Sequence, residues 1–251
     1  MAKGCLVINM ETTSCDMHEE LFVEIAYSQE PVPLDKEMVA EEWRYYKMSP
    51  AISSKYSAVA ALTRLYDEAC FYDRAITVCK LALRNSQLKE YRAELYFKMG
   101  EINEHKRDFD RALNSYLKSL RIGLGNGYMQ YWLYKNITFC YLIKKDFSTA
   151  ERHCRIAIDI GEANWIAERF REFDPNVSWE AWKNMGVVME HAGKYLEAAS
   201  FYTTAIKLSH RLSCPEISIL HLRRLLKRHP DLVRAWKEPV EDLLTYYNVI
   251  I

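Results

Sequence analysis

Two lysine–asparagine pairs are the first sign of binding chemistry in this 251-residue chain. The pair Lys135-Asn136 recurs 48 residues later as Lys183-Asn184. A lysine ammonium supplies positive charge, and an asparagine amide donates hydrogen bonds to a carboxylate or to a peptide backbone. The pairs therefore favour a ligand that offers carboxylates or main-chain carbonyls. The alternative is that both lysines only keep a helical surface soluble.

The sequence contains none of the common catalytic or nucleotide-binding motifs, such as a P-loop, G-x-G-x-x-G, G-x-S-x-G or H-E-x-x-H. A glycine-rich stretch at 123–127 follows a predicted helix rather than a strand, which argues against phosphate binding. His105 and His191 occupy equivalent positions near predicted turns, and we expect solvated turn residues there rather than a catalytic or metal-binding set. We therefore expect no enzyme activity, no cofactor and no metal.

Composition and cysteine usage predict a cytoplasmic protein. The seven cysteines form no C-x-x-C pair, and they have no histidines at metal-ligand spacing beside them. Several fall within a repeated pattern, where buried free thiols act as small hydrophobes, so we expect a reducing compartment. No apolar run approaches the roughly 20 residues that span a bilayer, and the start is too brief for a secretory signal.

The net charge is zero, with 34 basic and 34 acidic side chains, which argues against sequence-independent nucleic-acid binding. Residues 1–43 are nevertheless strongly acidic, and residues 207–237 are basic. Both stretches are explained by solvated helix faces. Alternatively, the acidic start masks the basic end, or each recruits its own partner. A charged-surface site would then use Arg223, Arg224, Lys227 and Arg228.

A fourfold internal repeat organises most of the chain. Windows at 59–83, 96–120, 134–158 and 182–206 align without a gap over 25 residues. Each window splits into two amphipathic halves joined by a short turn, which predicts an antiparallel helix pair. The fourteenth column is aromatic throughout. The seventeenth column is alanine in all four copies: Ala75, Ala112, Ala150 and Ala198.

Small residues recur at one position of each first helix, and Gly186 stands there in the last window. A glycine inside a helix costs about 1 kcal/mol relative to alanine. We expect this cost to be offset by packing, because a small residue at a helix crossing admits a large side chain from the partner helix.

The pattern W-x-x-M-G-x-x-M…A-x-x-x-Y of the last window resembles the tetratricopeptide repeat (TPR), W-x-x-L-G-x-x-Y…A-x-x-x-F…P. Two features depart from that family: no copy has the terminal proline, and the invariant alanines lie 37, 38 and 48 residues apart. The resemblance implies an all-α, right-handed superhelix of about four helix-turn-helix repeats with helical N- and C-terminal caps.

We predict three regions along the chain. An acidic, partly helical N-terminal segment covers residues 1–55, and a helical cap covers residues 213–251. The array between them, 56–212, contains repeats at about 56–89, 93–126, 131–164 and 179–212.

The resemblance also implies function, because the first helices of such an array line a concave groove that binds a partner peptide or helix. We therefore expect a non-enzymatic adaptor or scaffold. Lys135 and Asn184 fall at the positions of a carboxylate clamp known in the family, but Phe139 replaces its second asparagine, and a general peptide groove fits better. The expected groove residues are Arg64, Lys98, Trp132, Lys135, Asn136, Phe139, Lys183 and Asn184.

Two other functions stay open. In the first, the protein is a regulatory sensor whose acidic N-terminus covers the array. In the second, it binds RNA or an anionic surface through the basic C-terminal helix, although nucleic acid is the less favoured partner. Self-association is also possible, since repeat ends can stack.

Overall fold

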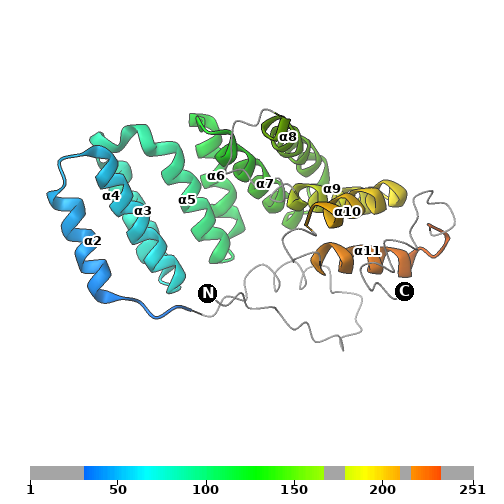
Figure 1. The fold of residues 1–251 in the computed structure, drawn as a ribbon, viewed down its shortest axis with the longest axis horizontal. Coiled ribbons are helices and arrows are strands. Elements are labelled where there is room, and N and C mark those ends of the chain that lie inside the picture. The colour runs from blue at the N-terminus through cyan, green and yellow to red at the C-terminus, as the bar shows by residue number, and fades with distance from the viewer. Residues whose placement is uncertain (1–30, 167–178, 210–215, 233–251) are drawn as a thin grey trace.

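The structure is a computed structural model that describes residues 31–166, 179–209 and 216–232. Its regular elements are all helical, and they stack side by side into an elongated array (Figure 1). They are α2 (Lys36–Met48), α3 (Ile52–Glu68), α4 (Tyr72–Arg84), the 3-10 helix η1 (Ser86–Tyr91), α5 (Arg92–His105), α6 (Phe109–Ile122), α7 (Gly127–Ile143), α8 (Phe147–Ile166), α9 (Trp179–His191), α10 (Tyr195–Ser209) and α11 (Glu216–Arg228).

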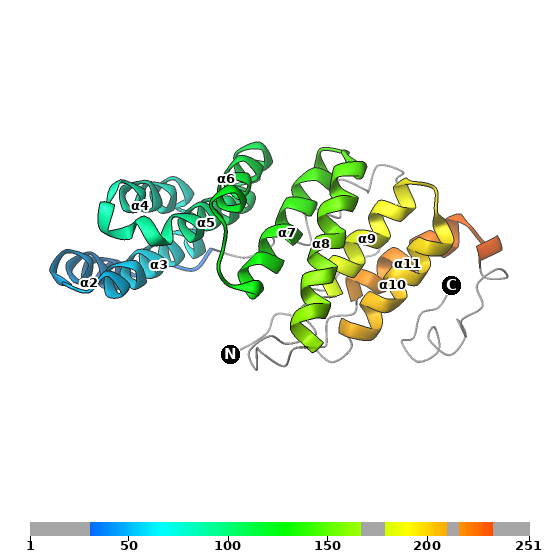
Figure 2. The ribbon, with the colours of Figure 1, turned by 90° about the horizontal axis from the view of Figure 1, so that it is seen from above.

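The predicted all-α repeat superhelix is confirmed. The helices pair as α3–α4, α5–α6, α7–α8 and α9–α10, and each second helix packs against the first helix of the next pair (Figure 2). Helix α2 precedes the array and α11 follows it, as helical caps. The region boundaries at 55 and 212 stay predictions. The predicted helical segments before residue 31 and after residue 232 lie outside the described residues.

The same turn joins the two helices of every repeat. Its central residue has a left-handed backbone, with φ of 60° at Cys70, 63° at Arg107, 60° at Lys145 and 73° at Gly193. The next N–H bonds to the carbonyl five residues earlier, as in a Schellman helix end. In the last repeat the Lys194 N–H donates to the Met189 carbonyl at 2.9 Å. Gly193 therefore lies in a turn that needs a positive φ.

The two helices of a repeat cross at the small residue that the alignment singled out, as predicted. A Cβ atom at Gly186 would lie 2.5 Å from the Tyr202 ring, and one at Gly100 would lie 2.3 Å from the Tyr116 ring. In the first repeat the same two positions hold Thr63 and Cys79, whose Oγ1 and Sγ atoms are 3.6 Å apart.

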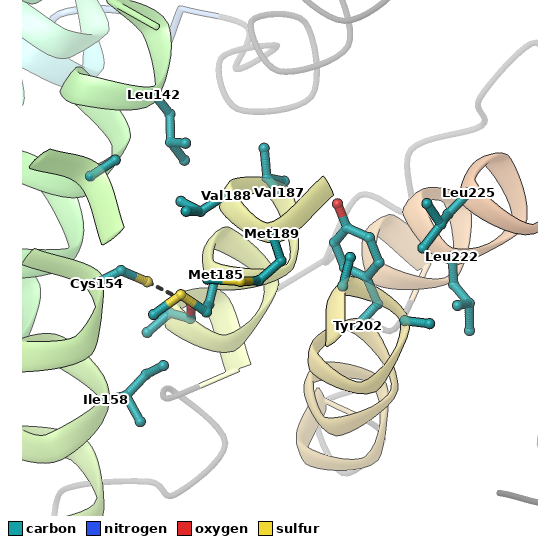
Figure 3. Packing of buried hydrophobic residues seen from close by; sticks show 14 of the residues in the cluster. Leu142, Cys154, Ile158, Met185, Val187, Val188, Met189, Tyr202, Leu222 and Leu225 are labelled. Carbon is teal, nitrogen blue, oxygen red and sulfur yellow. Dashed lines mark hydrogen bonds between the residues drawn. The ribbon is translucent and has the colours of Figure 1, made fainter. Parts of the chain in front are cut away.

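The C-terminal helix α11 is held by a buried charge. Tyr202 lies between α9 and the leucines of α11 (Figure 3), and its hydroxyl donates to Glu190 at 2.9 Å. The Arg224 guanidinium lies 3.1 Å from the same carboxylate, and that of Arg228 lies 3.6 Å from it. The Glu190 side chain is only 7% exposed, so these partners compensate for its loss of water. Burial and the Glu190 charge raise the pKa of Tyr202.

Polar and aromatic contacts at the turns join neighbouring repeats. Lys106 pairs with Asp73 at 2.6 Å, and the equivalent Lys144 pairs with Asp110 in the next repeat. His105 Nδ1 lies 2.8 Å from Asp67, and the His191 ring stacks on Phe147 with ring centres 4.1 Å apart. Both histidines are exposed near the turns, as expected, and each also contacts the preceding repeat.

The first prediction concerns the close crossing of α9 and α10 at Gly186. Gly186→Ala should lower the free energy of unfolding by about 1–3 kcal/mol, because the buried Tyr202 ring cannot move away from a new methyl group. Gly125→Ala is the control, since nothing lies within 4 Å of its Cβ position. Urea denaturation measures both. Equal changes in the two variants would contradict the crossing.

The second prediction concerns the buried carboxylate of Glu190. Glu190→Gln should destabilise the protein by about 2 kcal/mol, because it leaves two guanidinium groups without their carboxylate. Glu197→Gln, on the exposed side of α10, should have almost no effect. Thermal unfolding followed by circular dichroism compares them, and a similar small shift for both would show that Glu190 does not hold α11.

The third prediction concerns the contact between Asp67 and His105. Burial lowers the pKa of His105, but the hydrogen bond and charge of Asp67 outweigh this effect, and the pKa is raised. The pair's stabilisation is therefore full below the unfolded value of about 6.5, and it is lost as pH rises through the raised pKa. Asp67→Asn should cost more stability at pH 6 than at pH 9. The difference should be under about 1 kcal/mol because the pair is partly exposed. Urea midpoints that shift equally at both pH values would exclude the linkage.

Candidate functional site

The first helices of the third and fourth repeats bring aromatic and lysine side chains together. Helix α7 begins after Asn126, whose side chain accepts a hydrogen bond from the Tyr128 N–H at 2.8 Å. Trp132 and Lys135 then follow Tyr128 at intervals of four and three residues, which places all three on one side of the helix. Tyr128 meets Trp132 edge to face, with ring centres 6.1 Å apart. The start of α9 contributes Trp179, Glu180 and Lys183.

Lys135 connects these two helices. Its ammonium lies 4.1 Å from the centre of the Trp132 ring and 2.6 Å from a carboxylate oxygen of Glu180 on α9. The lysine side chain is only 14% exposed, so its charge is held in one place rather than moving freely in water. Cation–π contacts of this kind gain strength when they are partly desolvated.

Lys183 adds a second positive charge beside Glu180. Its ammonium lies 5.7 Å from the centre of the Trp179 ring. Burial raises the pKa of Glu180, but the charges of Lys135 and Lys183 outweigh it and lower the pKa. Burial also lowers the pKa of Lys183, against the opposing charge of Glu180. Glu180 is therefore ionised, paired with Lys135 and further stabilised by the charge of Lys183. We call Trp132, Lys135, Trp179, Glu180 and Lys183 the α7–α9 cluster.

Two buried polar atoms on the first helices of neighbouring repeats have no hydrogen-bond partner among the described residues. They are the indole nitrogen of Trp132 and one carboxylate oxygen of Glu94 on α5. The two residues occupy equivalent positions of neighbouring repeats, and Glu180 is the next in the series. An unsatisfied buried donor or acceptor costs about 1–3 kcal/mol, so a ligand that supplies the missing bond recovers that free energy.

The structure does not place all the predicted residues on the surface. Asn136 and Asn184 are 5% and 3% exposed, and the Asn136 amide donates to the Tyr116 hydroxyl at 3.1 Å. Phe139 is 8% exposed and packs edge to face on Phe109. All three side chains are buried, and Asn136 and Phe139 contact the preceding repeat, which corrects the expectation that the three face a ligand.

The two remaining predicted groove residues form ion pairs within their own helices. Arg64 lies 3.2 Å from Glu68 on α3, and Lys98 lies 2.7 Å from Glu101 on α5. The side chains of Arg64 and Lys98 are both substantially exposed, so these ion pairs add little to the stability of the fold. The expected groove residues did not include Glu94 and Glu180, although both share a column of the repeat with Trp132.

The basic C-terminal residues are partly used inside the molecule. Arg224 and Arg228 both contact Glu190, and the Arg224 side chain is 16% exposed. Arg223 is half-buried, and Lys227 is exposed. Two of the four predicted cations thus neutralise a carboxylate of the protein itself, which leaves less charge for a phosphate.

The described residues show little sign of other chemistry. Within 31–166, 179–209 and 216–232, no group of three His, Cys, Asp or Glu side chains is placed to hold a metal ion. The four cysteines in these ranges are free, and burial raises the pKa of Cys79 to about 11, which keeps its thiol protonated. No helix in these ranges is both long and apolar enough to cross a membrane.

Comparison with known proteins finds similar structures but no matching sequence family. No protein-family model and no curated protein sequence matches the chain. The structure of BtubC (BKLC) from P. vanneervenii matches with a TM-score of 0.60 and 15% identity over 94% of both chains. MamA matches with a TM-score of 0.51 and 16% identity, over 70% of this chain and 88% of MamA. The apo form of RapI matches with a TM-score of 0.55 and 12% identity, over 84% of this chain and 65% of RapI.

At these identities the likeness concerns the fold alone. Together with the four helix pairs, it shows that this chain is an all-α superhelix of the TPR-like type.

Proposed function

We propose that this protein is a non-enzymatic adaptor or scaffold, and that it binds a peptide or helix of another protein over the α7–α9 cluster. The observation that carries the proposal is the position of Lys135, which is held between the Trp132 ring and the Glu180 carboxylate. Beside it, the Trp132 indole N–H has no hydrogen-bond partner among the described residues.

The cluster is organised before a ligand arrives. Lys135 is fixed by a ring at 4.1 Å and a carboxylate at 2.6 Å, so binding costs little of its side-chain entropy. Tryptophan is enriched among the residues that dominate binding energies, particularly where neighbouring groups exclude water. A partly buried tryptophan beside a fixed charge meets both conditions.

The chemistry of the cluster indicates what the partner supplies. The indole N–H of Trp132 would donate to a main-chain carbonyl, and the unpaired oxygen of Glu94, at the equivalent position of the preceding repeat, would accept from a main-chain N–H. A carboxylate of the partner would compete with Glu180 for the two lysines. These are the groups of a peptide segment that carries an acidic side chain.

The proposal of a non-enzymatic role is supported by the absence of catalytic motifs in the sequence and by the helical-repeat fold. We also propose a cytoplasmic location, because the four described cysteines are free and three of them are buried.

The fourth prediction concerns this site. Peptides selected from a random display library against the full chain should bind it with an affinity measurable by calorimetry. Trp132→Ala and Lys135→Glu should each weaken binding by about tenfold or more, because they remove the stacking surface and invert the charge.

Arg152→Glu is the matched control, since Arg152 is exposed on α8 and lies outside the cluster. Its affinity should equal that of the unaltered chain, and circular dichroism should show equal helicity for all variants. If selected peptides bind Trp132→Ala and Lys135→Glu as well as the unaltered chain, the site is elsewhere. If no peptide is selected, the adaptor proposal loses its support.

A further inference from the structure

A second surface, distinct from the α7–α9 cluster, carries a concentration of positive charge. It is the solvent-exposed side of the second helices α4 and α6, in the first two repeats. In Figure 2 these helices lie along the upper edge of this half of the molecule, with α2, α3 and α5 below them. The exposed cations of this outer face are Arg74, Lys80, Arg84, Arg111, Lys118 and Arg121.

The cations follow the repeat most regularly in its first half. Arg74 and Arg111 are equivalent, as are Arg84 and Arg121, so both helices carry arginine near each end. In the third repeat these positions hold Thr149 and Asp159, and in the fourth they hold Glu197 and Lys207. Arginine at both of these positions is thus confined to the first two of the four repeats.

The acidic side chains nearby do not neutralise this outer face. Asp73 is paired with Lys106, and Asp110 with Lys144, at the turns between repeats. Arg111 pairs with Asp108. Among the described residues, the other five cations of the outer face have no ion pair.

Large apolar side chains are exposed among these cations. Phe71 is 43% exposed, Leu81 is 44% exposed and Ile122 is 51% exposed. The Arg74 guanidinium lies 5.1 Å from the centre of the Phe71 ring. Cations interleaved with exposed apolar groups fit an occupant that is both acidic and apolar.

We propose that the outer face of α4 and α6 is a docking surface for the chain's own N-terminal segment, residues 1–30. That segment has six acidic side chains and a single lysine. Residues 18–29, HEELFVEIAYSQ, alternate Glu19, Glu20 and Glu24 with apolar residues such as Phe22 and Ile25. The segment therefore offers negative charge to the cations of the outer face and apolar groups to its exposed Phe71, Leu81 and Ile122.

The path of the chain favours this occupant. The Val32 N–H donates to the carbonyl of Glu68 at 2.9 Å, at the C-terminal end of α3 (Figure 1). Phe71 and the start of α4 follow Glu68 by only a few residues, so the segment joins the structure at the edge of the outer face. As a helix, residues 18–29 would be about 18 Å long, close to the roughly 20 Å of the 13-residue α4.

Docking of this kind would keep the outer face from other anionic surfaces, and it leaves the α7–α9 cluster open. It therefore adds a second, regulated interaction surface that does not depend on the proposed function.

Photo-crosslinking in the full chain tests the proposal. With p-benzoylphenylalanine in place of Phe22, crosslinks mapped by mass spectrometry should fall on residues 71–84 and 109–122. Arg84→Glu/Arg121→Glu should reduce them by about fivefold or more, because like charges then face each other. Adding Glu20→Arg/Glu24→Arg to that variant should restore them, since the charges are exchanged rather than lost.

Arg152→Glu/Lys207→Glu is the matched control on the outer sides of α8 and α10, and it should leave the crosslinks unchanged. A mixture of isotope-labelled and unlabelled chains distinguishes docking within one chain from docking between two copies. Crosslinks between copies, crosslinks on α7 or α9, or crosslinks insensitive to the charge exchange would each overturn the proposal. Binding of phosphatidylserine vesicles that needs Arg84 and Arg121, without crosslinks, would assign the outer face to a membrane instead.

Discussion

The close crossing of two helices within each repeat is the constraint on which the rest of this structure depends. At Gly100 and Gly186 a tyrosine ring of the second helix occupies the space of a missing side chain. Where the first helix has Thr63, the second helix has the smaller Cys79. The combined volume of the two positions is thus kept within limits, as expected for a close-packed interior. The fixed crossing in turn sets the side of each first helix that remains exposed.

The tyrosine of the crossing also extends into polar networks between repeats. The Tyr116 hydroxyl donates to Glu104 and accepts from Asn136 of the next repeat. Tyr202 makes the equivalent bond to Glu190, which holds α11 through Arg224. One packing feature inside a repeat therefore determines how the following element docks. The stacking of repeats is specified by hydrogen bonds as well as by apolar area.

The candidate site lies where the repeat is least regular. The turn ion pairs of the first two junctions have no counterpart at the third, where the equivalent residues are Ala192 and Ser148. The repeats there are joined by Lys135 and Glu180 and by the stacking of Phe147 on His191. A partner bound over the α7–α9 cluster would compete for contacts that also join two repeats.

The repeat fold could be predicted from the sequence because it depends on local periodicity and on columns that recur four times. Trp132, Lys135 and Lys183 could be chosen for the same reason, since first-helix positions are equivalent in every copy. The burial of Asn136 could not be predicted, because it depends on a hydroxyl that reaches it from the preceding repeat. The ion pairs of Glu190 could not be predicted either, because they depend on the position of α11, which begins 26 residues later along the chain.

The most direct test of the central claim uses the indole N–H signals of the six tryptophans in the nitrogen-15 spectrum of the full chain. Trp132→Phe assigns the signal of Trp132. On titration with a bound peptide, that signal should move downfield and its exchange with water should slow, because the unpaired N–H acquires an acceptor. An unchanged Trp132 signal at saturating peptide would contradict the claim that the α7–α9 cluster is the binding site.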